Sequence, residues 1–121
     1  KPIWFGIGST GQTVFGLPGN PVPALVCLLR YVVPALAAMA GAPPRVAEHI
    51  PLGSAFKVKP ALTCFLPVGV EYSSTMGMVA MPRPTRGSGD LISLLGTDGF
   101  VELPPGPREI PAGFLAPLYR W

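Results

Sequence analysis

The chain has 121 residues, of which 49% are hydrophobic and only 12% are charged, and its formal net charge is +3. So many apolar residues exclude disorder, although 17 Pro and 15 Gly predict short strands joined by many turns. The small, dispersed positive charge is not typical of a nucleic-acid-binding protein, and we expect no nucleic acid partner. Because Lys1 leads directly into a strand-like run, we expect a piece of a longer protein.

Two short apolar runs open the chain, at residues 3–6 and 13–16. The loop between them contains Gly8 and Gly11, and this arrangement is typical of a β-hairpin. A helical run begins soon after the second apolar run, so we expect the two strands to lead into one helix.

The turn between the second strand and the helix reads Gly-Leu-Pro-Gly-Asn-Pro over residues 16–21. We expect the Asn20 side chain to cap the helix, which is worth about 1 kcal/mol, with Pro21 at the first helical position. Gly19 would allow a positive φ or the close approach of another group to the backbone. A helix N-terminus after a strand can bind phosphate or an oxyanion. An ordinary turn without a ligand has the same spacing, so both interpretations stay open.

The helix should cover residues 21–40, with Gly41 as its C-terminal cap and two prolines after it. Pro34 stands inside this range and removes an internal hydrogen bond at a cost of about 3 kcal/mol. We therefore expect a kink or a break near residues 31–33.

The expected helix is apolar nearly all round, so it needs cover on more than one side. Either a missing N-terminal part of the same domain or a second subunit would provide that cover. The longest apolar run, residues 22–29, ends at Arg30 and is far too short to span a bilayer. We therefore expect no membrane partner.

The residue pattern changes after a Pro-rich connector at residues 42–45, from helical spacing to the alternation of strands. We place a domain boundary there, with residues 1–43 in one domain and residues 44–121 in the next. The second domain should be a small all-β barrel or sandwich. Its expected strands cover residues 46–50, 55–59, 62–70, 76–81, 100–103 and 114–119. A helical segment should cover residues 88–95, with Ser88 as its cap.

Residue types that carry catalysis are few and scattered. Cys27 and Cys64 have no metal-ligand spacing around them, which indicates two reduced thiols in a cytosolic protein. His49 has no nucleophile close by in the sequence and should be an exposed strand residue. No two carboxylates fall on one helix face, and Asp98 before Gly99 is typical of a turn. We expect no catalytic residue and no metal ligand within this chain.

Several motifs follow one another in a particular order. They are Lys-Pro at residues 1–2, Val-Phe-Gly-Leu-Pro-Gly-Asn-Pro-Val at 14–22, Pro-Ala-Leu at 34–36, Gly-Ser-Gly-Asp-Leu at 87–91 and Gly-Phe-Val-Glu-Leu-Pro at 99–104. This series resembles the C-terminal part of the molybdopterin molybdenumtransferases of the MoeA and gephyrin E-domain family. The resemblance implies an α+β fold, in which a β-hairpin plus helix at residues 1–43 ends an α/β molybdopterin-binding domain. Residues 44–121 would then be the family's C-terminal β-barrel domain.

The resemblance also implies an activity. The family inserts molybdate into adenylylated molybdopterin and so forms molybdenum cofactor and AMP with Mg²⁺, as a cytoplasmic homodimer with its active site between the subunits. A molybdopterin-adenylating protein or domain is a further possible partner. The metal and nucleotide carboxylates of the family lie upstream of this chain. The residues that match the oxyanion side of the site are Lys1, Pro2, Gly19, Asn20, Ser88 and Gly89.

Two positions depart from the family pattern. Pro23 stands where the family usually has Ser, and Pro67 aligns where it usually has Arg. Both differences remove a hydrogen-bond donor from an anion site. There are therefore two alternatives to an enzyme. One is a binding or scaffolding module, since the gephyrin relatives also cluster receptors. The other is a barrel that only supports a dimer.

Overall fold

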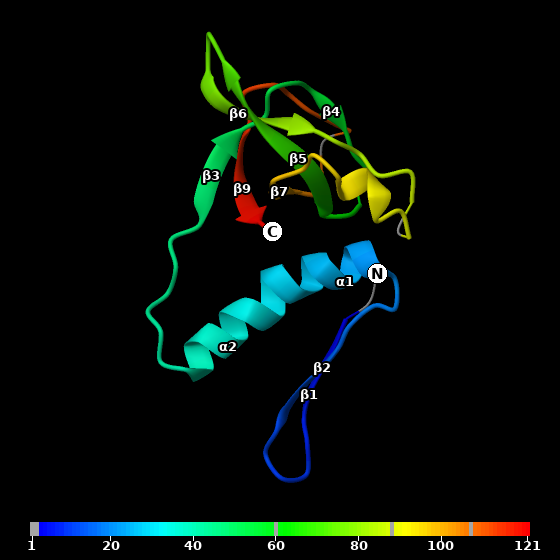
Figure 1. The fold of residues 1–121 in the computed structure, drawn as a ribbon, viewed down its shortest axis with the longest axis vertical. Helices are drawn as coiled ribbons and strands as arrows, with labels where there is room; N and C mark the ends of the chain where they lie inside the picture. The colour runs from blue at the N-terminus through cyan, green and yellow to red at the C-terminus, as the bar shows by residue number, and fades with distance from the viewer. Residues whose placement is uncertain (1–2, 60, 88, 107) are drawn as a thin grey trace. The chain divides into compact units, whose positions relative to one another are not determined.

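The structure is a computed structural model that describes residues 3–59, 61–87, 89–106 and 108–121 (Figure 1). The chain forms two compact units. One unit contains Lys1–Arg45 and Gly87–Leu91, and the other contains Val46–Arg86 and Ile92–Trp121. The domain boundary that we placed after residue 43 stays a prediction.

The first unit begins with the expected hairpin, in which β1 (Trp4–Ile7) pairs antiparallel with β2 (Thr13–Gly16). On one face the Trp4 side chain lies over Gly6 and against Gly16. On the other face the rings of Phe5 and Phe15 lie 5.2 Å apart between centroids. Both faces of the hairpin are therefore apolar, as in strands of a sheet that is covered on both sides.

The helix that follows contains the irregularity that Pro34 predicts. It consists of α1 (Pro21–Cys27), a π turn (Leu28–Val32) and α2 (Val33–Met39). Pro34 has no N–H and its ring crowds the carbonyl four residues earlier, so an α-helical bond cannot form there. The backbone widens before it, and the N–H of Val33 donates to the carbonyl of Leu28, five residues back. The helix continues through the proline without a break.

The helix ends as expected at Gly41, which has a φ of 74°. The N–H of Gly41 donates to the Ala38 carbonyl at 3.0 Å and the N–H of Ala42 donates to the Ala37 carbonyl at 2.9 Å. These two bonds satisfy carbonyls of the last turn, and glycine adopts the required left-handed conformation at little cost.

The second unit is a curled antiparallel sheet with the strand order β3-β9-β7-β5-β6. A two-stranded ribbon of β4 and β8 lies beside it in the fold (Figure 1). The strands are β3 (Glu48–Pro51), β4 (Phe56–Lys57), β5 (Cys64–Ser73), β6 (Gly77–Pro82), β7 (Gly99–Leu103), β8 (Glu109–Ile110) and β9 (Leu115–Arg120). A parallel bridge joins Leu52 to Ala80, and the N–H of Gly53 donates to the Ala80 carbonyl at 2.9 Å. These contacts bring the end of β3 to the outer strand β6 and curl the sheet into a half-barrel.

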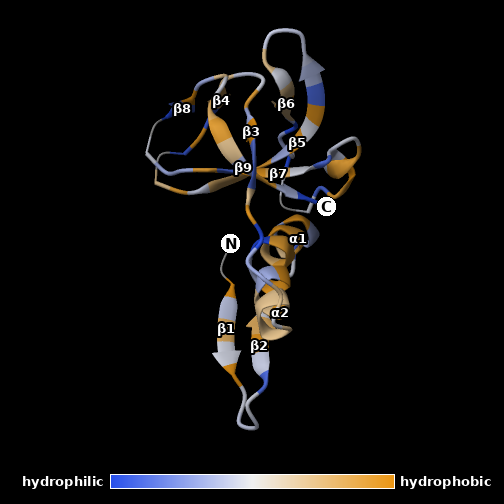
Figure 2. Cartoon of the chain, turned by 90° about the vertical axis from the view of Figure 1, so that its left-hand side faces the viewer, coloured by the Kyte–Doolittle hydropathy of each residue, from blue (hydrophilic) through white to orange (hydrophobic). Residues whose placement is uncertain are grey.

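The half-barrel encloses a continuous apolar core. Buried residues of six strands (β3, β5, β6, β7, β8 and β9) and of the loop after β3 meet there, and Leu52, Val68, Val101 and Leu103 have no exposed surface. The alternation of apolar and polar residues along the strands predicts this arrangement. Figure 2 shows the hydrophobic residues within the strands of this unit and along the helix of the other.

The six strands expected in this unit are confirmed, with ends shifted by at most three residues. The strand β8 was not predicted, because two residues in a Pro-rich stretch carry no alternation. The helical segment expected over residues 88–95 is too long. Among the described residues 89–95 only Ile92–Leu94 is helical, as one 3₁₀ turn, while Gly89 forms a short turn in which its carbonyl accepts from the Leu91 N–H. The expected cap Ser88 lies outside the described residues.

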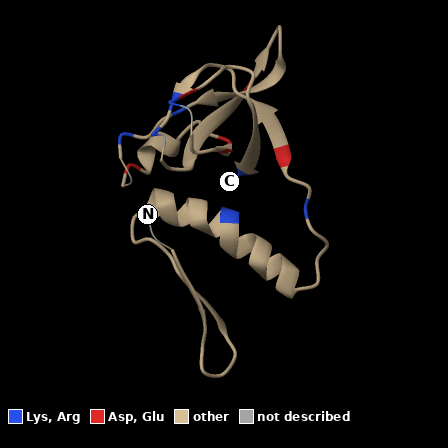
Figure 3. Ribbon diagram, turned by 180° about the vertical axis from the view of Figure 1, so that it is seen from behind, with Lys and Arg blue, Asp and Glu red and all other residues tan. Residues whose placement is uncertain are grey.

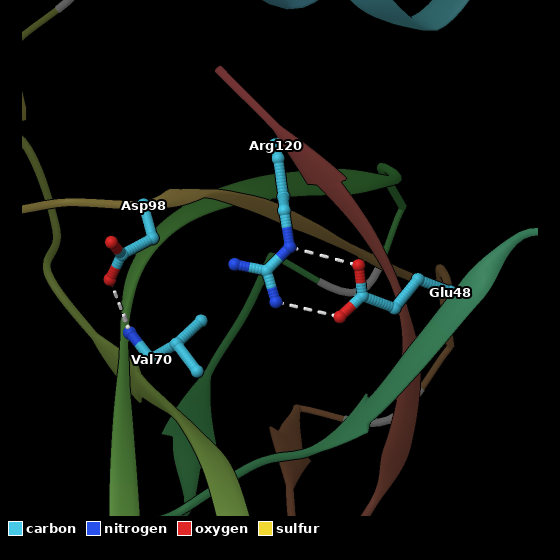
Figure 4. Close-up of polar contacts among 4 residues, drawn as sticks. All are labelled: Glu48, Val70, Asp98 and Arg120. Carbon is cyan, nitrogen blue, oxygen red and sulfur yellow. Dashed lines mark hydrogen bonds and ion pairs between the residues drawn. The ribbon is translucent and has the colours of Figure 1, made fainter.

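Asp98 connects three parts of the half-barrel (Figure 4). Its carboxylate accepts from the Val70 N–H at 2.7 Å and its own N–H donates to the Val68 carbonyl at 2.9 Å. Its carbonyl accepts from the Trp121 N–H at 3.3 Å, and the Trp121 indole donates to Thr97 at 2.8 Å. Asp98 therefore has a structural role, as expected, but it lies in the loop before β7, and the turn is at Leu95 and Gly96.

Arg120 joins the two strands at one side of the sheet. Its guanidinium donates to both carboxylate oxygens of Glu48, at 2.9 Å and 2.7 Å (Figure 4). The hydrogen bond from Arg120 holds the pKa of Glu48 below its ordinary value. Because the pair is half exposed, its effect on stability should be small.

We expect Gly99→Ala to destabilise the half-barrel. An added Cβ would collide with the Tyr119 carbonyl oxygen and lie 2.9 Å from the Cα of Arg120, and backbone atoms of a paired strand cannot move aside cheaply. Overpacking of this kind costs about 1–3 kcal/mol in the free energy of unfolding, measured by urea denaturation. Gly87→Ala is the control, since its Cβ would meet nothing within 4 Å. Equal stability of the two variants would contradict the packing described for Gly99.

Glu48→Gln should make stability less dependent on pH. A carboxylate with a lowered pKa stabilises the folded state above its unfolded pKa, and the stabilisation disappears as the pH falls through the folded pKa. The parent protein should have a higher free energy of unfolding than the Glu48→Gln variant, by at most about 1 kcal/mol at pH 7, and this difference should vanish in acid. Urea denaturation between pH 7 and pH 3 measures it. In an Arg120→Gln background the same substitution should show no such pH dependence, and a persisting dependence would exclude the ion pair as its cause.

Candidate functional site

The turn at residues 16–21 joins β2 to α1, as the sequence predicts, but Asn20 does not cap the helix with its side chain. Asn20 has the extended backbone of an N-cap residue, with φ −82° and ψ 137°, and its carbonyl accepts the first helical bond from the Ala24 N–H at 3.1 Å. A capping side chain accepts from the second or third helical N–H. The third helical residue here is Pro23, which has none, so the expected side-chain bond is wrong.

Gly19 also differs from one expectation. It is not among the glycines with a positive φ, and a Cβ added to it would meet nothing within 4 Å. The turn therefore requires no left-handed backbone at this position. The remaining explanation is that another group approaches the exposed backbone of Gly19, and this stays a prediction.

The helix N-terminus offers few donors to an anion. Pro21 and Pro23 are the first and third residues of α1, so Val22 alone among the first three has a backbone N–H. The seven residues of α1 lead directly into the π turn, so the regular helix behind these donors is short. Any anion bound here must depend on donors of the preceding turn and on side chains.

A second Gly-rich stretch belongs to the same compact unit as this turn. Gly87–Leu91 is far from residue 20 in sequence, yet its contacts place it with Lys1–Arg45. Within it the Asp90 N–H donates to the Gly87 carbonyl at 3.2 Å, and Gly89 has open space where a side chain would stand. The structure thus places three of the predicted site residues, Gly19, Asn20 and Gly89, in one unit. The other three, Lys1, Pro2 and Ser88, lie outside the described residues.

The other reactive side chains of the described residues do not form a cluster. Among the residues that the structure describes, no group of three or more His, Cys, Asp or Glu could hold a metal ion. Cys27 is buried and Cys64 half-buried, and both are free thiols whose pKa is raised by burial. His49 is exposed on β3, as predicted, with its Nδ1 2.9 Å from the Ala47 carbonyl.

The helix carries an apolar surface that its own unit leaves exposed. Its exposed side chains include Leu28, Tyr31, Val33, Leu36 and Met39. Figure 3 shows a single charged position along this helix, and the sequence has Arg30 as its one charged residue. The Arg30 guanidinium lies 5.3 Å from the centre of the Tyr31 ring. The predicted need for further cover is consistent with this exposure.

The apolar helix in the structure is longer than the apolar run of residues 22–29 from which we judged that the chain cannot span a bilayer. Over the described residues, the 19-residue helix Pro21–Met39 is long and apolar enough, by length and composition, to cross a membrane. The length of the apolar segment judged from residues 22–29 was therefore too short, because the helix continues past Arg30. Core helices of soluble proteins pass the same criterion, so the absence of a membrane partner stays a prediction.

One feature of the half-barrel was missed in the sequence. A shallow depression of about 340 Å³ is lined by Thr63, Glu102, Pro104, Pro105, Phe114 and Pro117. Tyr119 donates from its hydroxyl to the Glu102 carboxylate at 3.0 Å. The Pro-Pro pair at residues 104–105 was the available signal, but the lining comes from strands and loops that only the fold brings together.

Comparison with known proteins agrees with this architecture. Residues 49–121 match the family described as MoeA C-terminal region (domain IV). The whole chain is 40% identical over 122 residues to the molybdopterin molybdenumtransferase of Synechocystis sp., of which it covers 29%. A crystal structure of the molybdopterin biosynthesis MoeA protein from Pyrococcus horikosii superposes with a TM-score of 0.75 and 30% identity, over 99% of this chain and 29% of that one. A second one, from Pyrococcus horikoshii OT3, gives a TM-score of 0.74 and 25% identity, over 97% of this chain and 29% of that one.

The curled sheet of the second unit is thus a domain of the MoeA C-terminal type. The chain belongs to the MoeA family. It spans less than a third of the length of these relatives. The resemblance stated from the motifs is confirmed, and so is the β-rich C-terminal domain, while the α/β domain expected before it stays a prediction.

Leu36→Glu should disturb assembly or solubility of a full-length protein that carries this chain. Leu36 is 54% exposed on the apolar helix, and a carboxylate there would oppose burial against another domain or subunit. Sedimentation and thermal melting measure the effect. Tyr72→Glu, at a position that is 78% exposed on β5, is the control and should change neither. If the Leu36 variant also sediments and melts like the parent, the helix surface needs no cover.

Proposed function

We propose that this chain is the C-terminal part of a molybdopterin molybdenumtransferase, which inserts molybdate into adenylylated molybdopterin in molybdenum cofactor biosynthesis. The observation that carries this proposal is the 40% identity to the Synechocystis enzyme over the full length of the chain. The aligned region covers both the hairpin-helix unit and the half-barrel. A likeness confined to the half-barrel would support the fold alone.

The proposed contribution of this chain is the oxyanion side of the site. Lys1 would supply the positive charge, while the backbone N–H groups near Gly19, Asn20 and Gly89 and the Ser88 hydroxyl would donate hydrogen bonds. The membership of residues 16–21 and 87–91 in one compact unit supports this grouping. Molybdate and the phosphate of molybdopterin are both anions, so one set of donors and one cation can orient either of them.

Magnesium chemistry is not assigned to this chain. The carboxylates of the described residues do not form a cluster that Mg²⁺ would bind, and we derive no step through the ion. In the proposed enzyme the Mg²⁺ ligands lie upstream of Lys1. The proposal also includes a cytoplasmic homodimer, with a molybdopterin-adenylating protein or domain as partner.

A second candidate function is a non-catalytic binding or scaffolding module. The proline at the third position of α1 favours it, because Pro23 supplies neither a hydroxyl nor an N–H where the family usually has Ser. An enzyme that keeps its activity must replace these donors from elsewhere in the site. Activity of the full-length protein therefore separates the two candidates.

The full-length protein should release AMP from adenylylated molybdopterin when Mg²⁺ and molybdate are added, and residues 1–121 alone should not. The expected inactivity of the short chain follows from its scattered carboxylates and from the exposed helix. AMP is quantified by chromatography, with heat-denatured protein as the control. No AMP from the folded full-length protein would overturn the enzyme and leave the scaffolding module. Release by the short chain would show that the upstream carboxylates are not needed.

Pro23→Ser should tighten molybdate binding by the full-length protein. The matched control is Pro23→Ala, which restores the same backbone N–H without a hydroxyl. A hydrogen bond to a charged group is worth about 1.5–3 kcal/mol, so the Ser variant should bind about tenfold to a hundredfold more tightly than the Ala variant. Calorimetric titration with molybdate measures both affinities. Equal affinities would mean that the hydroxyl at this position does not reach the anion.

Pro67 is not a suitable second position for this test. It is buried in β5, opposite Phe100 of β7, and its carbonyl accepts from the Arg83 N–H at 2.8 Å. Its side chain alternates with those of Leu66 and Val68, which line the core, and so lies on the other face of β5. Because that position is also buried, an arginine there would bury a charge, which costs several kcal/mol unless the charge is paired. The effect of Pro67→Arg on molybdate would therefore be mixed with a loss of folding.

A further inference from the structure

We draw no further inference here: the strongest candidate, the shallow depression on the half-barrel that Thr63, Glu102, Pro104, Pro105, Phe114 and Pro117 line, carries nothing because nothing in the structure shows what covers it.

Discussion

The missing backbone N–H of proline determines where hydrogen bonding stops in both units of this chain. In the helix, Pro34 makes the α-helical bond to the residue four positions earlier impossible, and the chain responds with a π turn at Leu28–Val32. The helix therefore continues as one element and carries its apolar surface past Arg30. A break at this point would have given two short helices and a different surface. The response to one absent donor thus leaves the exposed apolar side chains on a single long helix.

The same constraint organises the half-barrel. Pro67 lies in β5 opposite Phe100 of β7, one residue before the pairing with β6 begins at Val68. Pro117 lies in β9 just beyond Leu118, the last residue paired with β7. Each proline therefore stands just outside the pairing with one of its two neighbouring strands, so a ladder bond on that side is not lost. The sheet can then curl until Leu52 meets Ala80, which closes the apolar core without a long exposed edge.

Sequence reasoning succeeded where a pattern has one physical solution. Alternating apolar residues located six strands, and Gly41 followed by prolines located the helix end. It failed where the structure of a residue depends on which other residues lie next to it in the fold. The Asn20 cap was a sound expectation from residue type, but a capping side chain needs an N–H at the second or third helical position. Pro23 removes the N–H at the third position, and the Asn20 side chain makes no cap bond to the second. The two-residue strand β8 exists only because Phe56 and Lys57 lie opposite it, and no local pattern records partners that are 54 (110 − 56) and 52 (109 − 57) residues away. The grouping of residues 87–91 with the first unit is equally invisible to local patterns.

The distribution of donors bears on how an anion could be held at the turn of residues 16–21. A helix N-terminus ordinarily contributes several free N–H groups and a partial positive charge. Here two of the first three residues are prolines, so the number of N–H groups falls while the peptide dipoles remain. The field of a seven-residue helix can still attract an anion, but it cannot orient one, because orientation requires directed hydrogen bonds. In the proposed site, orientation would therefore have to come from the Gly-rich segments at residues 16–21 and 87–91, whose exposed backbone at Gly19 and Gly89 has no side chain in the way. In this chain the helix would attract the anion, and the backbone N–H groups near the glycines would orient it.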